Sequence, residues 1–134
     1  MQIQTKPSDA EPAAAPSALR QDVVADLLEL QQAVSALRAK LSLLESRVER
    51  ARLHLAAGGP AADLPRVAHV MESRAEVNGA LAEVQRMRHR SQRSLFLLAV
   101  EEGFSLAEIA RTWGISRQLV SRMTKEPADK VVED

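Results

Sequence analysis

The feature that most constrains the fold is an unbroken heptad repeat between residues 19 and 57. Apolar residues recur there in alternating steps of four and three, and no Gly or Pro interrupts the repeat. This spacing places the apolar side chains in one narrow stripe along a helix about 58 Å long. A stripe so narrow must be covered by another helix. Its members are Val23, Leu27, Leu30, Val34, Leu37, Leu41, Leu44, Val48, Ala51 and Leu55.

The covering helix can come from a second copy of the chain or from a later part of the same chain. We expect a homodimer through the coiled coil, with an intramolecular hairpin against residues 65–100 as the alternative. In a parallel dimer Lys40 would attract Glu45 of the second copy. Arg47 would repel Arg52 of that copy, so charge does not select the orientation. The residues expected at the dimer contact are Leu27, Leu30, Val34, Leu37, Leu41, Leu44 and Val48.

A break follows the heptad at Gly58-Gly59-Pro60, and a second helix is expected over residues 65–90. Asn78-Gly79 is a turn signal inside this helix, which predicts a bend or a break there. The apolar stripe of the helix is ragged, and this favours the dimer over a complete hairpin. Polar residues stand where apolar ones are expected at Arg74, Arg88 and Ser91.

Composition agrees with an all-α fold. The three aromatic residues, Phe96, Phe104 and Trp113, all lie in the last third of the chain. The remainder must pack on Leu, Val, Met and Ala, as long helices do. We therefore expect a long coiled-coil helix or a helical hairpin, followed by a small trihelical domain. The expected segments are a disordered arm (1–18), a coiled-coil helix (19–57), a second helix (65–90), a trihelical domain (91–125) and a disordered acidic tail (126–134).

Several classes of protein are disfavoured by what the sequence lacks. There is no cysteine, hence no disulfide framework and no thiolate metal site. The first residues show no apolar segment of a secretory signal, and no apolar run approaches about 18 residues. We expect a cytoplasmic protein with no membrane partner.

Residues 103–123 have the spacing of two short helices joined by a tight turn. Ser105, with Glu108 three residues later, forms a capping box for the first helix, and Ser116 caps the second. Gly114 supplies the positive φ that the turn needs. The inward positions are Ile109, Ala110, Trp113, Ile115, Val120 and Met123. With the helix that precedes it, this pattern predicts a helix-turn-helix.

The outward face of the second helix suits a reader of the DNA major groove. Arg matches the O6 and N7 atoms of guanine, and Gln matches the N6 and N7 atoms of adenine. In a helix-turn-helix the N-terminal residues of this helix meet the base edges. The outward residues are Arg117, Gln118, Ser121 and Arg122.

Residues 114–123 resemble the turn and recognition helix of lactose-repressor-type regulators. The trihelical unit is also similar to sigma-factor region four and to resolvase-type DNA-binding domains, over about 30 of the 134 residues. The chain has no room for the sugar-binding domain of the repressors or for a resolvase catalytic domain, so the resemblance implies DNA binding alone. Trp113 departs from the aliphatic residue common at its position. The resemblance implies base contacts by Arg117, Gln118 and Arg122 and phosphate contacts by Ser116 and Ser121.

The distribution of charge supports double-stranded DNA as the partner. The formal net charge is zero, but residues 86–125 contain 8 basic and 3 acidic residues and are flanked by acidic segments. This basic block coincides with the motif, and neutralised phosphates would make binding fall steeply with salt. The residues expected at phosphates are Ser105, Ser116, Ser121, Arg86, Arg88, Arg90, Arg93 and Lys125.

No motif for catalysis or cofactor binding is present. His54, His69 and His89 lie far apart without carboxylates at ligand spacing, so neither a metal site nor a catalytic site is expected. No cofactor and no small-molecule ligand is expected either. The sequence favours a dimeric, nucleoid-associated transcriptional regulator. The alternatives are an adaptor that binds a sigma factor or RNA polymerase, and a non-specific nucleoid-packing protein.

Overall fold

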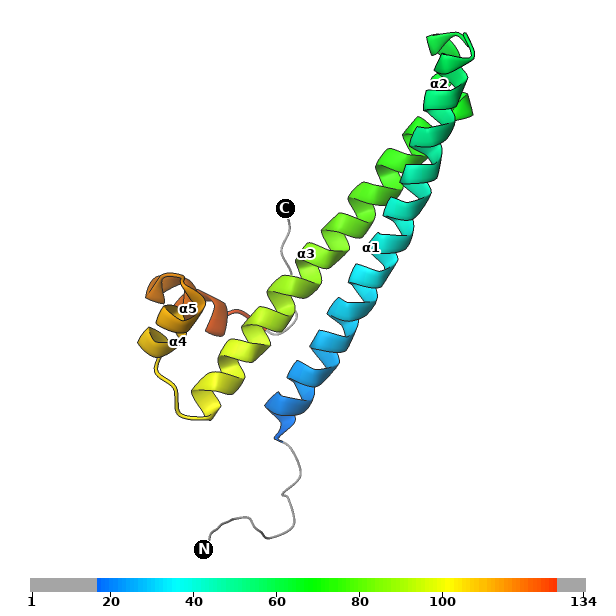
Figure 1. Cartoon of the computed structure of the whole chain (residues 1–134). Coiled ribbons are helices and arrows are strands. Elements are labelled where there is room, and N and C mark those ends of the chain that lie inside the picture. Colours follow the sequence, from blue (N-terminus) through cyan, green and yellow to red (C-terminus); the bar gives the residue numbers. More distant parts are fainter. Residues whose placement is uncertain (1–16, 128–134) are drawn as a thin grey trace, which may run out of the picture.

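The structure is a computed structural model that describes residues 17–127. Every regular element among these residues is a helix, which confirms the expected all-helical class. Figure 1 shows a long hairpin of two helices with two short helices at one end. The expected arm (1–18) and acidic tail (126–134) lie outside the described residues, except for two residues at the inner end of each.

The first helix of the hairpin is α1 (Ala18–Ala56), one continuous helix of 39 residues. It begins at Ser17, whose hydroxyl accepts a hydrogen bond from the Arg20 N–H at 3.1 Å. The chain leaves the helix through Gly58, which has a φ of +87°. Glycine adopts this left-handed conformation without steric cost, so the helix ends where the Gly-Gly-Pro sequence predicted.

The tip of the hairpin consists of η2 (Ala61–Asp63) and α2 (Leu64–Val67). His69 has a φ of +52° and separates α2 from α3 (Val70–Glu101). The second long helix thus begins later than the expected residue 65, and the domain limit placed between residues 90 and 91 falls inside it. It also continues through Asn78-Gly79, so the bend or break predicted there is absent. The pair lies on an open surface, where one glycine costs only about 1 kcal/mol.

The helices α1 and α3 run antiparallel and side by side (Figure 1), and this contact divides the heptad of α1 into two rows. The inner row is buried or half-buried, whereas the outer row is exposed. The inner row consists of Val23, Leu30, Leu37, Leu44 and Ala51. The outer row consists of Leu27, Val34, Leu41, Val48 and Leu55.

The side of α3 that packs on α1 also follows a heptad, which shares every second position with the ragged stripe seen in the sequence and is shifted by one residue at the others. Arg74, Leu81 and Arg88 of that stripe are exposed. The buried and half-buried positions are Ser73, Val77, Ala80, Val84, Met87, Ser91, Ser94 and Leu98. The hairpin is therefore complete along α3, although the sequence favoured the other arrangement.

Small residues make this seam possible. Ser73, Ser91 and Ser94 are 6%, 3% and 4% exposed, and each hydroxyl is satisfied. Ser91 and Ser94 donate to the carbonyls of Arg88 and Ser91 at 3.1 Å. Ser73 accepts from the Arg47 guanidinium at 2.9 Å. Satisfied hydroxyls can be buried at little cost, so serines serve here as small packing residues.

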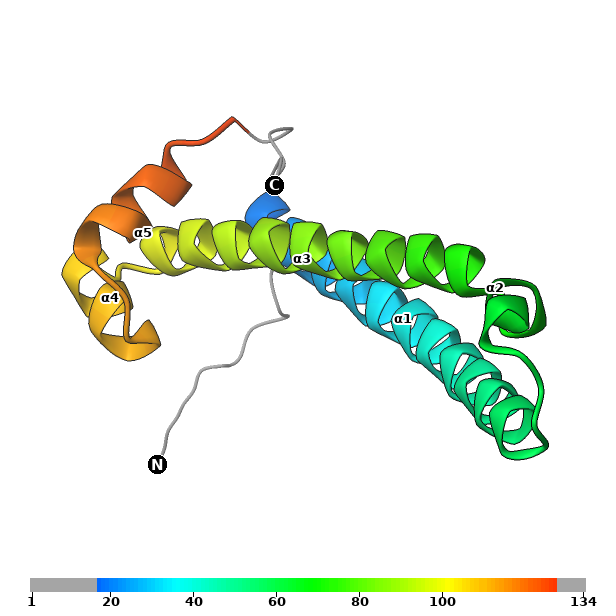
Figure 2. The same cartoon turned by 90° about the horizontal axis from the view of Figure 1, so that it is seen from above.

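The end of α3 packs with α4 (Leu106–Trp113) and α5 (Arg117–Thr124) around a separate core. We call α4, α5 and the last turns of α3 the head, and Figure 2 shows it wrapped around one end of α3. Phe96 and Val120 are fully buried at its centre. The core consists of Phe96, Ile109, Ala110, Val120 and Met123, and Ala99, Leu106, Ile115 and Leu119 pack against it.

Polar contacts fix the head and the hairpin to one another. Arg93 donates to the carbonyl of Glu126 at 2.6 Å, and His89 contacts the Glu126 carboxylate at 2.8 Å. Near the start of α1, Arg20 pairs with Glu102. These contacts tie the segment after α5 to α3, and the start of α1 to the end of α3.

Candidate nucleic-acid interface

The beginning of α4 is fixed by a complete capping box. The Ser105 hydroxyl accepts from the Glu108 N–H at 3.1 Å, and the Glu108 carboxylate accepts from the Ser105 N–H at 2.8 Å. The hydrogen bonds from Ser105, first from its backbone and then from its side chain, lower the pKa of Glu108 below its ordinary value of 4.5. The charge of Arg111 lowers it further. The box holds the first turn of α4 at neutral pH.

The turn between α4 and α5 is tight, and its conformation is fixed by a left-handed glycine and two hydrogen bonds. Gly114 has φ +69° and ψ +34°, and the Ile115 N–H donates to the Ala110 carbonyl at 3.0 Å. The Ser116 hydroxyl then accepts from the Leu119 N–H at 3.1 Å and begins α5. A left-handed glycine followed directly by a capped helix changes the chain direction within three residues.

One side of α5 is buried in the core of the head, and this determines which of its side chains face outward. Val120 and Met123 are 0% and 2% exposed. Arg117, Gln118 and Arg122 are exposed, as is Lys125 just beyond the helix, while Ser121 is half-buried. A shallow hollow is lined by Leu106, Arg117, Gln118, Ser121 and Arg122.

The structure therefore brings the three expected base-contacting residues to one surface, together with Ser121. It also places Leu106 there, which sequence reasoning had not included. An apolar residue at the start of an amphipathic helix indicates a core position, and no other signal in the sequence marks it. We call the surface formed by these five residues the α5 face.

The cations of the α5 face are unpaired, in contrast to the carboxylates of the head. Within residues 17–127, the side chains of Arg117 and Arg122, and that of Lys125 just beyond the face, have neither a hydrogen-bond nor an ion-pair partner. Each acidic side chain between residues 95 and 127 has one. Glu101 accepts from Ser17, Glu102 pairs with Arg20, Glu108 is in the capping box, and Glu126 meets His89. Among residues 17–127, the surface charge that remains uncompensated around α5 is positive.

The arginines of α3, expected at DNA phosphates, are not gathered on the α5 face. Arg86 pairs with Glu83, and Arg90 pairs with Glu29 of α1 at 3.3 Å. Arg93 is held by the carbonyl of Glu126. Arg88 is exposed and lines a groove with Leu27 and Trp113. Three of the four thus have partners within the chain.

The serines expected at phosphates have local roles as well. The Ser105 and Ser116 hydroxyls accept capping hydrogen bonds, and both residues are exposed. A hydroxyl that accepts one hydrogen bond still has a proton to donate to a phosphate oxygen. The capping role and the expected phosphate contact are therefore compatible.

Neither a metal centre nor a membrane span is found in the described part of the chain. No three His, Cys, Asp or Glu side chains group there as metal ligands. His54 contacts the Pro60 carbonyl at 2.9 Å, and His89 meets Glu126. None of the helices between residues 17 and 127 is both long and apolar enough to cross a bilayer.

The residues expected at a dimer contact are divided between the two rows of α1. Leu30, Leu37 and Leu44 belong to the inner row and lie against α3 of the same chain. The members of the outer row remain exposed, by 40% to 58%. Those expected at the contact are Leu27, Val34, Leu41 and Val48.

Comparison with known proteins gives no match. No protein-family model matches the sequence, and neither the curated proteins nor the solved structures show a significant similarity to it.

Proposed function

We propose that the protein is a dimeric DNA-binding transcriptional regulator whose head is a helix-turn-helix. In this proposal α5 enters the major groove as the recognition helix. The observation that carries it is the α5 face: exposed, unpaired Arg and Gln side chains on the first turns of a short, firmly capped helix. Residues at the N-terminal end of a recognition helix are those that reach base edges.

The chemistry of these residues suits direct readout. Arg117 and Arg122 can each donate two hydrogen bonds to guanine, and Gln118 can pair with adenine. Ser121, Ser116 and Lys125 are near enough along the chain to contact the flanking phosphates. Base contacts specify the sequence and phosphate contacts fix the register, so both kinds of group are needed on one surface.

The local structure favours a recognition helix that is held rigidly before it binds DNA. The capping box, the left-handed Gly114 and the Ser116 cap determine where α5 begins, and Val120 and Met123 anchor it in the core. A site built on a packed helix holds its side chains in place before binding. This reduces the conformational entropy lost on association.

The proposal is tested by fluorescence anisotropy with duplexes selected from a random pool. Arg117→Ala and Gln118→Ala should each lose about 1–3 kcal/mol of discrimination at one base position. Lys125→Ala should weaken all duplexes alike. The matched control is Arg50→Ala, which removes an exposed cation from α1. If Arg50→Ala weakens binding as much as Arg117→Ala, the α5 face is not the reading surface.

An adaptor that docks on a sigma factor or RNA polymerase is the second candidate. It is favoured by two large apolar side chains exposed on the head, Phe104 at 52% and Trp113 at 45%. Recovery of polymerase subunits after nuclease treatment, together with no affinity for free duplexes, would support the adaptor. Equal affinity for every duplex would instead indicate non-specific packing of the nucleoid.

A further inference from the structure

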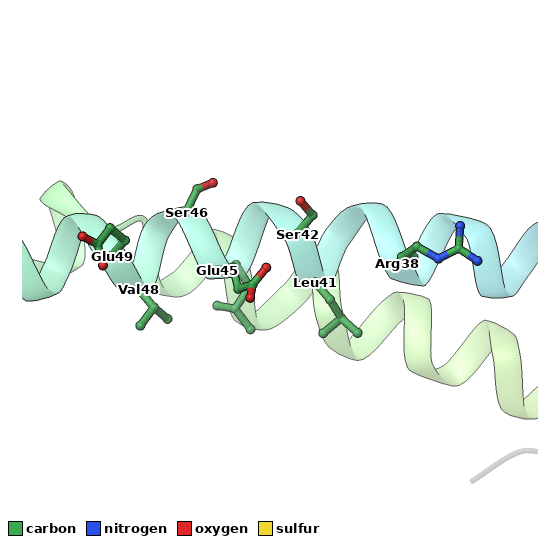
Figure 3. Close-up of a pocket in the computed structure, with 8 residues that line it drawn as sticks. Arg38, Leu41, Ser42, Glu45, Ser46, Val48 and Glu49 are labelled. Atoms are coloured by element: carbon green, nitrogen blue, oxygen red, sulfur yellow. The ribbon is translucent and has the colours of Figure 1, made fainter.

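The outer row of α1 is a regular apolar surface that the hairpin leaves uncovered. Its five members recur every seven residues over four heptads, and their exposed fractions are 42%, 40%, 44%, 58% and 47% from Leu27 to Leu55. Figure 3 shows Leu41 and Val48 projecting from one side of α1, with Glu45 between them. Other exposed apolar residues on α1, such as Leu28 and Leu53, do not follow this repeat. A narrow heptad stripe of this length indicates a helix–helix contact.

The same side of the hairpin has apolar surface from α3. Val70 is 39% exposed and lies with Val48 in a largely apolar hollow of about 350 Å³. Arg74 lines this hollow, and Arg88 lines the groove that contains Leu27. Leu81 lies midway between these two arginines in the heptad, so it belongs to the same side. Because the arginines interrupt the α3 stripe, α1 supplies the centre of the surface.

We propose that the outer row binds the outer row of a second copy of this chain, antiparallel, with Leu41 on the two-fold axis. This inference deepens the proposed function, since it specifies the dimer on which that function rests. Leu27 then meets Leu55 of the second copy, and Val34 meets Val48. A two-fold axis makes both contacts twice, as a self-complementary surface requires.

Charge selects the antiparallel orientation. Beside the outer row, Arg38 and Glu45 are exposed and have no ion-pair partner within residues 17–127. With Leu41 on the axis, Arg38 lies next to Glu45 of the second copy, and this pair forms twice. A parallel pairing would place Arg38 beside Arg38 and Glu45 beside Glu45, and like charges at a contact are unfavourable.

The two arginines whose repulsion left the orientation undecided in the sequence are engaged within the chain. Arg47 is held inside the hairpin by Glu76 at 3.0 Å, and its side chain is only 14% exposed. Arg52 is bound to Glu49 at 2.6 Å on its own helix. Lys40, which would attract Glu45 in a parallel coiled coil, is half-buried and stands in heptad register with Ala33 and Arg47, on the side of α1 that faces α3. Arg38 and Glu45 are therefore the deciding pair beside the outer row.

Cysteine cross-linking tests the orientation directly, because the chain contains no cysteine of its own. In the antiparallel dimer L41C should cross-link to itself with a short thiol reagent. V34C and V48C should not do so alone, because each lies about 21 Å along the axis from its equivalent. A mixture of V34C and V48C should give cross-linked dimer. Self-cross-linking of V34C and of V48C would overturn the antiparallel orientation, and a failure of L41C to cross-link would overturn the contact.

A charge exchange gives a second test, which keeps the proposal falsifiable even if a cysteine variant folds poorly. Arg38→Glu and Glu45→Arg should each raise the dimer dissociation constant about three- to tenfold at low salt, and the double exchange should restore it. Sedimentation of the full chain measures this constant. The matched apolar control is Leu53→Gln against Val48→Gln, since these residues are 53% and 58% exposed. Equal effects of Leu53→Gln and Val48→Gln on the dissociation constant would contradict the proposal.

These measurements contain no DNA, so they separate the two proposals. An antiparallel dimer that binds no duplex would leave the contact standing and defeat the proposed function. A monomer that binds duplexes with sequence preference would defeat the contact and the dimer, and would leave DNA reading by the α5 face standing.

Discussion

Phe96 and Trp113 meet edge to face, with ring centroids 5.3 Å apart and ring planes at 83°. Phe96 is fully buried, whereas Trp113 is 45% exposed. Such pairs contribute about 0.5–1.5 kcal/mol beyond the burial of their area. The contact joins the end of α4 to α3, so the large side chain that departs from the expected aliphatic residue fixes α4 against the hairpin.

The two aromatic residues should therefore differ in their contribution to stability. Phe96→Ala should lower the free energy of unfolding by about 3–5 kcal/mol, since it empties the centre of the core. Trp113→Ala should cost about 1–2 kcal/mol, because half of the ring already contacts solvent. Denaturant unfolding followed by circular dichroism measures both, with the exposed Phe104→Ala as the control. A larger loss for Trp113 than for Phe96 would contradict this packing.

Gly114 and Gly79 form a matched pair for testing the turn. A Cβ added at either residue meets no atom within 4 Å, so only the backbone conformation distinguishes them. Gly114→Ala should destabilise the head by about 1–2 kcal/mol, because φ is +69°. Gly79→Ala should stabilise α3 by about 0.5–1 kcal/mol, since glycine is unfavourable inside a helix. Thermal unfolding of the two variants should shift in opposite directions, and shifts of the same sign would refute the assigned turn geometry.

The capping box should make the head sensitive to acid. The pKa of Glu108 is lower in the folded chain than its ordinary value of 4.5. The contribution of the Glu108 carboxylate to the free energy of unfolding is therefore complete above the ordinary pKa of 4.5. It is lost as the pH falls through the lowered pKa of the folded chain. Glu108→Gln should be less stable than the natural chain at pH 7, and the difference should shrink below about pH 4.5. Unfolding curves at several pH values measure this, and a difference that grows in acid would be the opposite result.

Features encoded by neighbouring residues were predictable from the sequence. The Ser105–Glu108 box and the left-handed Gly114 each depend on residues within a few positions of one another. The continuity of α1 depends on a repeat whose successive members are only three or four residues apart. Their physics is local, so the sequence pattern determines them without knowledge of the rest of the fold.

The positions of α3 that pack on α1 could not be predicted from the hydrophobicity of the residues. Ser73, Ser91 and Ser94 are counted as polar, although each is buried with its hydroxyl satisfied. The partners of Arg90 and Arg93 are 61 and 33 residues away along the chain, so no local pattern reveals that these arginines are engaged. For the same reason the sequence could not show that the heptad of α1 is divided into a row packed on α3 and an exposed row.

The proposed dimer also predicts how the two heads are spaced. Arg90 contacts Glu29, and Arg93 holds the end of the head at the same level of the hairpin. Glu29 is twelve residues from Leu41, so the two equivalent levels lie about 36 Å apart along the axis. The core of each head lies beyond this level, because Phe96 is six residues further along α3 than Arg90, so the two heads are more than about 36 Å apart along the axis.

Binding should accordingly depend on the spacing of the half-sites. A duplex whose half-sites lie a whole number of helical turns apart should bind most tightly, and about 5 added base pairs should weaken binding by turning one site to the opposite side. Anisotropy titrations with such duplexes measure this. Affinity that is indifferent to spacing would show that the two heads do not act together.

The most direct test of the central claim is a titration of the natural chain with its selected duplex at several salt concentrations. Because the claim is that Arg and Lys side chains of the head neutralise phosphates, the logarithm of the binding constant should fall linearly with the logarithm of salt. Each phosphate contact should contribute about −0.9 to the slope, and the selected duplex should bind more tightly than a random one at every concentration. No binding, or binding that salt leaves unchanged, would contradict the claim that this protein reads DNA.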